Sequence, residues 1–567
     1  MALAEKVELT RTSRRGFLVK TGTGAAAAAA LSVGGSSAAF AQMAGNVLRL
    51  NTGSEPDTID PQKASFVSEI EKIMMVFRNL LQFDKDGNLV ADQAVGMPAL
   101  DEGGTLMTFR LRDDITFSDG KPVTAQDFVY GWRRHMDPRT NGEYSFLGYI
   151  IAGGEAYNTA DPAKVGESGL AQLREALGVR ALDDKTVQFK LNSPAPWFLS
   201  VLSTWCGVPT REDKVMAGNG GIESESKWTE PATYIGNGPY ILTDWEHQNR
   251  MHFRANPSYF TGPPPIAERD FAMINEPAVA FAAYLNDELD VTGVQTEDRP
   301  RVNSDPALSA QFQQYAGSCT FYVGFNIARP PFNDTRVRRA FSFGLDRTSF
   351  VRNILGGAGL PARQFLPPGF PGYYEFELEE QVFNPSVGRA LLAEAGYPNG
   401  QGLPTIKYGF SSSARNKTRA EAIAAQYKQS LGVTIELDPI ESRAFTAAMK
   451  QPATTPQSFL LGWCQDYPDP QNWYSTVWHS KSAIQHSSWN NAEFDYVTSV
   501  ADTHPDPQER RNLYLRAAQI LLNDVPAAML YHNVVWRLVK PRLKGTRPDP
   551  LERFLGENDL YNLKIEG

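Results

Sequence analysis

The chain has 567 residues, of which 42% are apolar and 21% are charged, close to the averages of soluble globular domains. This composition excludes a disordered scaffold, and the length predicts roughly three or four domains whose segments can interleave along the chain. The formal net charge of −9 argues against nucleic-acid binding, because that function needs clustered Lys and Arg.

The N-terminal residues have the order of an export signal. Arg14 and Arg15 precede a weakly apolar stretch at 21–38, and Ala39-Phe40-Ala41 is a small-x-small cleavage motif. This order matches a twin-arginine signal peptide cleaved after Ala41, so we expect an exported, periplasmic protein. An uncleaved membrane anchor is less favoured, because the stretch is short for a span of about 20 apolar residues. A lipoprotein would need a cysteine near the processing site, and the sequence has none there.

The mature chain expected after this cleavage is more acidic than the whole. Residues 1–41 carry five basic and two acidic side chains, so their removal changes the formal charge from −9 to −12. We find no second apolar stretch of spanning length, so we expect the mature protein to be free in its compartment.

The three cysteines, Cys206, Cys319 and Cys464, are far apart and include no CxxC pair. A structural zinc site normally needs close ligand pairs and is therefore not favoured. In an oxidising periplasm two of the three can pair and leave one free, but the residues alone do not decide which two.

The remaining sequence alternates strand-like and helical stretches, which predicts a mixed α and β fold. Residues 47–51 are expected to form a short strand that leads into the turn-rich segment 52–57, a kind of loop that often carries function. Residues 67–81 have helical periodicity. Residues 84–87 form a hairpin turn signal between strands at 80–83 and 88–90. They could also begin a calcium loop, but its later oxygen ligands and closing Glu are missing.

Further along, the same kinds of signal predict several more elements. The segment containing Pro and Ser at 193–196 is a candidate crossing between domains. The other predictions are a strand at 105–111, a helix capped by Thr124, a turn at 183–186 before a strand at 187–191, a tight turn at 236–240 before strands around 241 and 253, a break at 330–332, and helices at about 334–346 and at 386–396, the latter stopped by Gly396.

Catalytic motifs are largely missing. There is no HExxH, and the histidine pairs lack the i, i+4 spacing of a shared metal site. The nearest relative of G-x-S-x-G, at 340–344, falls inside a predicted helix, so Ser342 is interpreted as a packing residue. No Walker or dinucleotide glycine fingerprint follows a strand. We therefore expect no catalytic residue, no metal and no cofactor, and a secreted hydrolase with an unrecognised site is the more distant alternative.

Aromatic residues and prolines concentrate at 460–474. An apolar strand is expected to end at Gly462, which leaves the backbone open to a neighbour, and then to present Trp463, Asp466 and Tyr467 before two prolines. The residues alone fit a core strand followed by an ordinary loop equally well.

Several longer runs resemble one known family, the periplasmic oligopeptide-binding proteins of bacterial ABC importers, within extracellular solute-binding protein family 5. The runs are spread over essentially the whole mature chain. They are Gly-Ser-Glu at 53–55, Ser-Asp-Gly-Lys-Pro-Val-Thr-Ala-Gln-Asp-Phe-Val-Tyr at 118–130, Pro-Phe-Asn-Asp-Thr-Arg-Val-Arg at 331–338, Leu-Leu-Ala-Glu-Ala-Gly-Tyr at 391–397 and Gly-Trp-Cys-Gln-Asp-Tyr at 462–467.

The resemblance implies an α/β, periplasmic-binding-protein-like type II fold with two main lobes, a hinge of two crossover strands and an extra domain. Residues 42–67, 198–318 and 535–567 are expected to form lobe 1, residues 68–197 the extra domain and residues 319–534 lobe 2. Closing of such lobes around a ligand is a hinge motion. The family expectation is a monomer.

The resemblance also implies the function. The chain would be the periplasmic substrate-binding component of an ABC importer, which binds short peptides in extended conformation between its lobes and delivers them to membrane permease subunits. The peptide would be held as an added strand against backbone groups of Gly462 and Cys464. Asp466 falls where the family places the carboxylate that pairs with the peptide's α-ammonium group.

Further ligand contacts implied by the resemblance are Glu55, Tyr144, Val294, Gln295 and Trp463. The enteric members pair the cysteines that correspond to Cys319 and Cys464, which would leave Cys206 free.

One position departs from the family. The enteric proteins have an arginine for the peptide's carboxylate three residues before the tryptophan, whereas this chain has Leu460. Lys450 lies near a second basic position and is a candidate carboxylate partner. A non-peptide solute, such as a metal chelate, an oligosaccharide or an opine, or a murein peptide is therefore the nearer alternative ligand.

Overall fold

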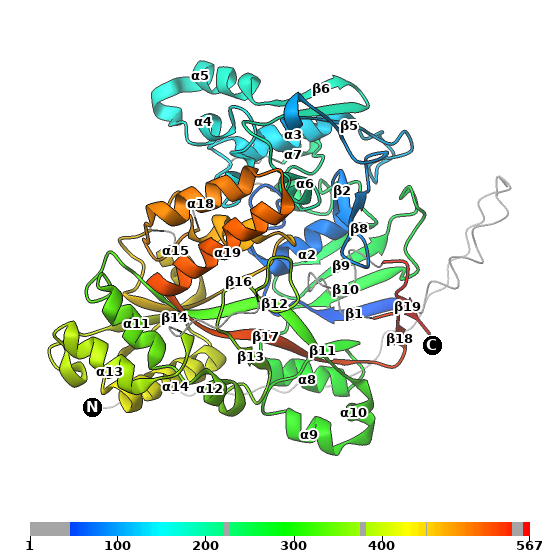
Figure 1. Ribbon diagram of the computed structural model, residues 1–567. Coiled ribbons are helices and arrows are strands. Elements are labelled where there is room, and N and C mark those ends of the chain that lie inside the picture. Colours follow the sequence, from blue (N-terminus) through cyan, green and yellow to red (C-terminus); the bar gives the residue numbers. More distant parts are fainter. Residues whose placement is uncertain are drawn as a thin grey trace, which may run out of the picture. The chain divides into compact units, whose positions relative to one another are not determined.

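Two long antiparallel strands, β12 (Phe312–Phe325) and β17 (Ala527–Val539), cross the middle of the molecule (Figure 1). The computed structural model describes residues 46–218, 227–374, 381–449, 451–482, 484–546 and 560–566. Both strands are rich in aromatic and β-branched residues, which favour extended backbone, and most of their side chains are buried.

These strands are the centre of a seven-stranded sheet in the order β11-β17-β12-β16-β14-β15, with β13 paired to β17. The other strands are β11 (Val291–Gly293), β13 (Gly359–Pro361), β14 (Lys407–Ser411), β15 (Glu436–Ile440) and β16 (Ser458–Cys464). β16 pairs with β12 along its whole length but with β14 only at Ser458 and Phe459. Among the described residues, β16 therefore has a strand neighbour on one side only from Leu460 onward.

The ladder between β12 and β17 is interrupted near its middle. Pairing ends at Ala316 with Val534 and resumes at Thr320 with His532. In the gap, the Asn533 side chain accepts the N–H of Cys319 at 2.9 Å. A Cβ on Gly317 would approach the Asn533 side-chain oxygen to 2.2 Å, so glycine is needed where this side chain replaces the regular backbone pairing.

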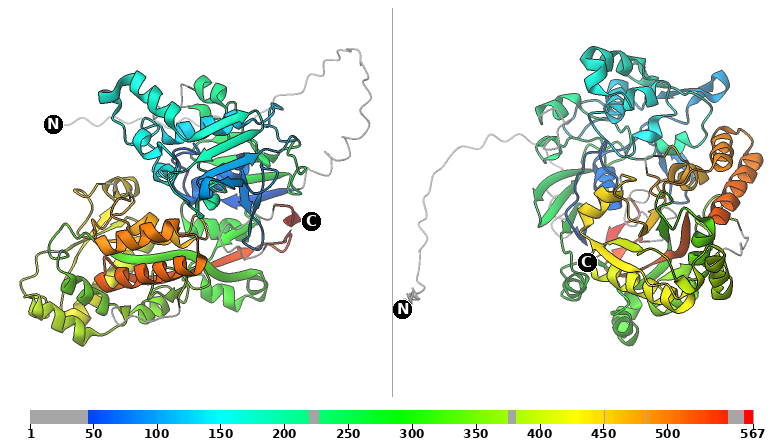
Figure 2. Two further views of the ribbon diagram at one scale, coloured as in Figure 1. Left: turned by 45° about the horizontal axis from the view of Figure 1, so that its top comes forward. Right: turned by 90° about the vertical axis from the view of Figure 1, so that its left-hand side faces the viewer.

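Helices cover both faces of the large sheet. Successive residues of β12 and β16 point to opposite faces, so neighbouring residues join different apolar cores. Val323 and Leu460 join one apolar core with α11 (Thr335–Phe343), α12 (Arg347–Asn353), α13 (Pro385–Glu394) and α14 (Ala414–Leu431). Tyr322 and Phe459 join another with α15 (Ser442–Met449), α16 (Pro470–Trp473), α17 (Ser475–Trp478), α18 (Ala492–Thr503) and α19 (Pro507–Asp524). Figure 2 shows α18 and α19, in orange, side by side.

A second sheet of four strands has the order β1-β10-β9-β8, with β1 parallel to β10. Its strands are β1 (Val47–Asn51), β8 (Tyr240–Glu246), β9 (Arg250–Ala255) and β10 (Glu268–Ala272). Helix α2 (Val67–Val76) packs on this sheet, and α8 (Pro277–Leu285), α9 (Arg299–Ser304) and α10 (Pro306–Gln311) follow β10.

A third sheet lies at the top of Figure 1, with the order β4-β5-β7-β6. Its strands are β4 (Ala99–Asp101), β5 (Leu106–Arg110), β6 (Val179–Asp183) and β7 (Thr186–Lys190), accompanied by α3 (Ala125–Met136), α4 (Gly154–Asn158) and α5 (Pro162–Ala176). Trp132 of α3 packs edge-on against Phe189 of β7, with ring centroids 5.9 Å apart.

Short elements complete the described chain. Strands β2 (Leu81–Phe83) and β3 (Leu89–Ala91) form the predicted hairpin around 84–87. The rest are β18 (Leu543–Lys544), β19 (Lys564–Ile565), α6 (Phe198–Val201), α7 (Glu212–Ala217) and the 3-10 turns Glu102–Gly104, Ser145–Gly148, Lys227–Thr229 and Pro398–Gly400.

Two predicted boundaries are wrong. The helix predicted at 67–81 ends at Val76. The side chain of buried Asn237 accepts the N–H of Arg78 and donates to its carbonyl, both at 3.0 Å, so a distant residue takes the bonds that another helical turn would have used. The strand predicted to end at Gly462 continues to Cys464, because its pairing with β12 extends to Cys319.

A buried ion pair joins the segment after β1 to helix α3. Arg134 contacts both carboxylate oxygens of Asp60 at 2.6 Å, and both side chains are 4% exposed. Burial by itself would raise the pKa of Asp60, but the Arg134 guanidinium outweighs it and the net shift is downward. A buried pair with this two-point geometry strongly disfavours loss of either partner.

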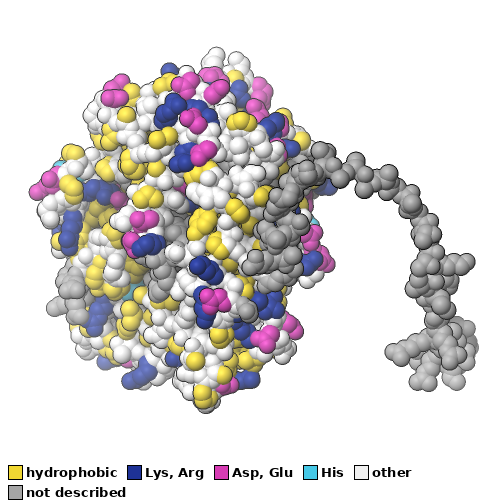
Figure 3. Space-filling model, turned by 90° about the vertical axis from the view of Figure 1, so that its right-hand side faces the viewer, with side chains coloured by type: hydrophobic (Ala, Val, Ile, Leu, Met, Phe, Trp, Pro, Cys, Tyr) yellow, Lys and Arg dark blue, Asp and Glu magenta, His cyan; other side chains and the backbone are white. Residues whose placement is uncertain are grey.

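The surface is of mixed character. Acidic and basic side chains are interspersed with apolar ones on the face shown in Figure 3. Among the described residues, no helix combines the length and apolar character that crossing a bilayer requires.

A partly buried carboxyl lies between α17, α18 and α19. Asp502 accepts hydrogen bonds from Ser475 Oγ at 2.7 Å and from the Tyr514 hydroxyl. Burial raises the pKa of Asp502 to about 7. The nearby Arg510 instead holds both oxygens of Asp469, at 2.7 and 2.9 Å.

We predict that Asp502 makes the protein less stable as pH rises through neutrality. Its folded-state pKa of about 7 exceeds the unfolded value of about 3.9. The folded state therefore binds more protons in that window, and its stabilising contribution, complete below pH 4, is lost by pH 8. Asp502→Asn should flatten the fall in melting temperature between pH 5 and pH 8. All other titrating groups are the same in the two proteins, so equal falls in melting temperature would contradict the assignment of this pH dependence to Asp502.

Candidate functional site

A cavity of about 540 Å³ lies between the sheet β1-β10-β9-β8 and the end of β16. Its lining comes from segments far apart in sequence: the loop after β1, α2, β10 and the connection to α8, β11, the middle of β12, and the loop after β16. Cavities of roughly 300–1,000 Å³ are the usual size for small-ligand sites. The cavity is therefore large enough for a ligand of a few residues.

A disulfide between Cys319 and Cys464 forms part of the cavity wall. It joins residues that face each other across β12 and β16, and it closes a loop with a sequence separation of 145. The pairing is the one that the resemblance implies, and Cys206 is the free, buried cysteine, with the pKa of its thiol raised to about 12 by burial. The bond fixes the end of β16 and therefore the start of the loop that carries Asp466.

The carboxylate of Asp466 lines the cavity and accepts from two neutral donors. Asn472 Nδ2 donates to Oδ2 at 2.9 Å, and the Tyr144 hydroxyl donates to Oδ1 at 3.4 Å. Burial, followed by the charge of Asp466, raises the pKa of Tyr144 well above its usual value, so the phenol remains a donor at neutral pH. Both of these donors are neutral, and a carboxylate on a cavity wall is a group that a cationic part of a ligand can approach.

The rest of the wall is mixed in character. Ile70 and Met75 of α2 and Phe271 of β10 supply apolar surface. Glu71 contributes a carboxylate that pairs with Lys72 at 2.7 Å, and Arg269 contributes a guanidinium over the Tyr240 ring at 4.7 Å. Such a wall accommodates a ligand that has both apolar and polar groups.

The structure brings only some of the predicted contact residues to this cavity. Gln295, Cys464 and Asp466 line it, and Tyr144 reaches its edge through Asp466. Glu55 does not line it. Its carboxylate accepts from Trp245 Nε1 at 3.0 Å and lies 2.7 Å from His247 Nδ1, and Gly53 takes the place on the wall.

Gly462, Trp463 and Val294 also lie outside the lining. A Cβ on Gly462 would meet the Phe321 ring at 2.7 Å, so this glycine makes room for an aromatic neighbour. Trp463 packs against two apolar cores, and Val294 is buried in a third. Lys450, Arg14 and Arg15 lie outside the described residues.

A cationic side chain lies on the face of β12 that carries the disulfide. Cys319 and Phe321 are two residues apart and share this face. The Arg419 guanidinium of α14 lies over the stacked rings of Phe321 and Tyr531, at 5.6 and 5.4 Å from their centroids. Arg415, one turn earlier, donates to Gln295 at 2.5 Å. Leu460 on the same side is 6% exposed in an apolar core and offers no charge.

The electrostatic surroundings of Arg419 contain no acidic partner among the residues that the structure describes. Its Nε has no hydrogen-bond partner there. Burial lowers the pKa of Arg419, and the nearby groups that also act on it are tyrosines and Arg415 rather than a carboxylate. The Phe321 and Tyr531 rings thus support a guanidinium, and Arg419 lies outside the lining of the cavity.

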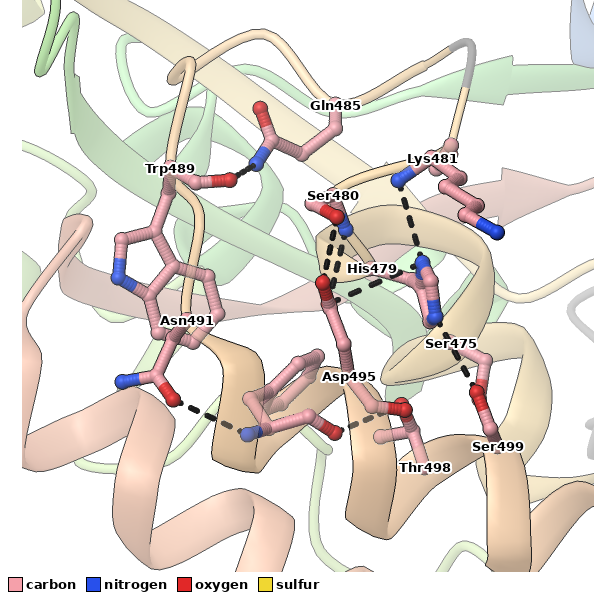
Figure 4. Close-up of polar contacts among 12 residues, drawn as sticks. Ser475, His479, Ser480, Lys481, Gln485, Trp489, Asn491, Asp495, Thr498 and Ser499 are labelled. Carbon is pink, nitrogen blue, oxygen red and sulfur yellow. Dashed lines mark hydrogen bonds and ion pairs between the residues drawn. The ribbon is translucent and has the colours of Figure 1, made fainter.

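A serine, a histidine and an aspartate meet near α18 (Figure 4). His479 Nε2 lies 3.3 Å from Ser499 Oγ, and Nδ1 lies 3.7 Å from Asp495. However, Nδ1 also accepts the N–H of Lys481 at 3.1 Å, which places the ring proton on Nε2. In this tautomer the histidine cannot take the serine proton, and Ser499 lies inside a helix rather than on an elbow. The cluster is a polar surface contact and not a nucleophile site.

No group of three or more His, Cys, Asp or Glu side chains within the described ranges is arranged to hold a metal ion.

Comparison with known proteins identifies the family. The profile described as "Bacterial extracellular solute-binding proteins, family 5 Middle" matches residues 89–485. The chain belongs to this family. It is 31% identical to the periplasmic oligopeptide-binding protein OppA of Escherichia coli over 532 residues, which cover 91% of this chain and 92% of OppA.

Two further similarities concern family members with other named ligands. The probable deoxycholate-binding periplasmic protein YgiS of E. coli is 28% identical, with 91% of this chain and 93% of YgiS covered. The solved structure of the E. coli murein tripeptide binding protein MppA is 26% identical with a TM-score of 0.79, and 92% of this chain and 98% of MppA are covered. This likeness confirms the predicted α/β, periplasmic-binding-protein-like fold.

Part of the cavity wall of this family 5 protein is not predicted from its sequence. Arg269 and Phe271 on β10 and the segment from Ile274 to Ala280 line the cavity, but no motif marks them. The sequence of β10 does contain one signal for these residues. Alternation along β10 turns Arg269 to the same buried side as Phe271, and a basic residue at an inward strand position is uncommon enough to indicate a site.

Proposed function

We propose that this family 5 protein is the periplasmic substrate-binding component of an ABC importer, which binds short peptides in extended conformation and delivers them to permease subunits. The observation that carries the proposal is the Asp466 carboxylate on the wall of a cavity beside an open strand edge. The name of the relative OppA, an oligopeptide-binding protein, supports the same ligand class.

The open edge of β16 is the proposed contact for the peptide backbone. β16 lacks a strand neighbour beyond Phe459 within the described residues, so its outward N–H and C=O groups can pair with an extended chain. Such bonds carry no information about side chains. We therefore infer broad tolerance of peptide sequence, with water filling unused side-chain space.

Asp466 is the proposed partner of the peptide's α-ammonium group. It is the group that sets the register, because a buried carboxylate and ammonium lose several kcal/mol if either is left unpaired. The negative charge also disfavours an anionic solute at this end of the cavity.

Arg419 is the proposed partner of the peptide's carboxylate, in place of an arginine at position 460. Phe321 faces Gly462 across the ladder, and Asp466 follows Gly462 by four positions, two of them beyond the end of β16. At about 3.3 Å per extended residue, we infer a separation of at most about 13 Å between the two charges along the strand direction. An extended peptide covers that distance with roughly four residues. We therefore infer a preference for peptides near this length.

The lobes are proposed to meet at β12 and β17. The boundaries expected at 318/319 and 534/535 fall inside these two strands, beside the interruption in their ladder. We further propose that residues 1–41 are a twin-arginine signal peptide cleaved after Ala41, that the protein acts as a monomer, and that it is not an enzyme.

A specific non-peptide solute is the second candidate. The name of the relative YgiS and the apolar wall formed by Ile70, Phe271 and Ile274 favour an amphipathic molecule. Asp466 would repel a bile-acid carboxylate at its end of the cavity, whereas Arg269 and Arg537, which also line the cavity, would attract one.

We predict that protein purified from a peptide-rich medium carries a heterogeneous set of ligands. Native mass spectrometry should show many peptide masses, because backbone recognition does not select a sequence. One defined non-peptide mass would favour the second candidate, and protein that retains no ligand and instead cleaves added peptides would favour a hydrolase.

We predict that Asp466→Ala weakens binding of a free-amine tetrapeptide by about 2–4 kcal/mol, because the ammonium loses a buried charged partner. Calorimetric titration of the same peptide with an acetylated N-terminus should change far less. Equal losses for the two peptides would remove Asp466 from this role.

We predict that Arg419→Gln lowers the affinity for a tetrapeptide with a free carboxylate by about tenfold, the value of one charge-assisted hydrogen bond. The amidated peptide should be affected little. Lys417→Gln is the matched control, since Lys417 is 68% exposed on the same helix and faces Glu421 at 4.0 Å. A loss of similar size in the control, or for the amidated peptide, would exclude Arg419 as the partner.

A further inference from the structure

Three side-chain pairs are nested across the loop that follows β16. They are Gln465 with Trp473 at 3.2 Å, Asp466 with Asn472 at 2.9 Å, and the Tyr467 hydroxyl with Gln471, and they enclose the turn 468–470. Each pair is symmetric about Asp469. The loop is therefore closed by its own side chains before any ligand is bound.

Asn472 makes two bonds to one residue. Its Oδ1 accepts the backbone N–H of Asp466 at 3.0 Å, and its Nδ2 donates to Asp466 Oδ2 at 2.9 Å. Asn472 is fully buried, so water does not compete for these bonds. Because the same amide holds both the backbone and the carboxylate, it fixes the direction of the carboxylate relative to its own chain.

The short helix that carries Asn472 is anchored from outside the loop. Asp469 accepts the N–H of Gln471 at 2.8 Å at the start of α16. Arg510 of α19 holds both oxygens of Asp469, at 2.7 and 2.9 Å, and both side chains are 14% exposed. Helix α19 thus helps to set the position of Asn472 from outside the loop.

We propose that Asn472 is the positioning residue for recognition of a ligand's ammonium group, because it holds the Asp466 carboxylate in its ligand-facing orientation before the ligand arrives. The inference rests on the proposed function. Three consequences follow from the geometry. The carboxylate loses no rotamer freedom on binding, its charged form is stabilised by a neutral donor, and Tyr144 at Oδ1 completes the support from the opposite side.

Asn472→Leu tests this role, because leucine has a similar volume but makes neither bond. The readout is the ratio of the dissociation constants of N-acetylated and free-amine tetra-alanine, measured by calorimetric titration of the full mature protein. We expect the ratio to fall about tenfold, through weaker binding of the free-amine peptide alone. A purely structural role would weaken both peptides equally and leave the ratio unchanged.

Asn326→Leu is the matched control. Asn326 is equally buried, and its amide donates to the carbonyls of Pro452 at 3.3 Å and Thr455 at 3.1 Å, away from Asp466. This variant should lose stability without changing the ratio. If Asn472→Leu does not fold, Asn472→Ser, which keeps a small hydrogen-bonding group, should fold and lower the ratio by a smaller factor.

The outcomes separate the two proposals. A wild-type protein that does not distinguish acetylated from free-amine peptides would overturn the proposed function. A wild-type protein that does distinguish them, together with an unchanged ratio in Asn472→Leu or Asn472→Ser, would overturn the role of Asn472 alone.

Discussion

The continuity of β12 and β17 is the constraint on which the rest of the structure depends. β11 pairs with the C-terminal end of β17, and β16 pairs with the C-terminal part of β12. Both sides of the cavity are therefore connected to the same pair of strands. Movement of one side against the other must bend these strands. The interruption at Gly317, where Asn533 replaces backbone pairing, is where the fewest ladder bonds resist bending.

Neutral hydrogen-bond donors support the Asp466 carboxylate on the cavity wall. Asn472 and Tyr144 provide donors without charge, and the Phe321 and Tyr531 rings support a guanidinium in a similar way at the other side of the disulfide. Hydrogen bonds from neutral groups and contacts with aromatic rings therefore support two charged side chains in partly buried surroundings.

Local signals in the sequence account for what could be predicted. The turn at 84–87, the cap at Thr124 and the stop at Gly396 depend on neighbouring residues, and the corresponding hairpin and helices are present. The early end of α2 depends on Asn237, which is far away in the chain, and no local pattern contains that information. The same holds for Gly462, where the Phe321 ring on the paired strand leaves no room for a Cβ.

For the site too, residues in a recognisable local run can be predicted from the sequence, and contacts between distant segments cannot. Asp466 stands in a run with a recognisable pattern, and the family resemblance gives it a role. The support from Asn472 and Arg510, the lining from β10 and the cation on α14 arise from assembly of separate segments, so they are visible only in three dimensions. The resemblance placed Glu55 on the ligand-facing edge, but the side chain turns to Trp245 and His247, which the family pattern does not encode.

The nested pairs of the loop at 465–473 also bear on how such a site can be transferred. Several of the bonds that shape this loop are internal, and its contacts with other segments include the two-point contact to Arg510, the Tyr144 hydroxyl and a backbone bond from Gln465 to Ser318 at 3.1 Å. A graft of this loop onto another strand end would therefore have to reproduce the arginine at the position of Arg510, the paired strand that carries Ser318 and the tyrosine at the position of Tyr144.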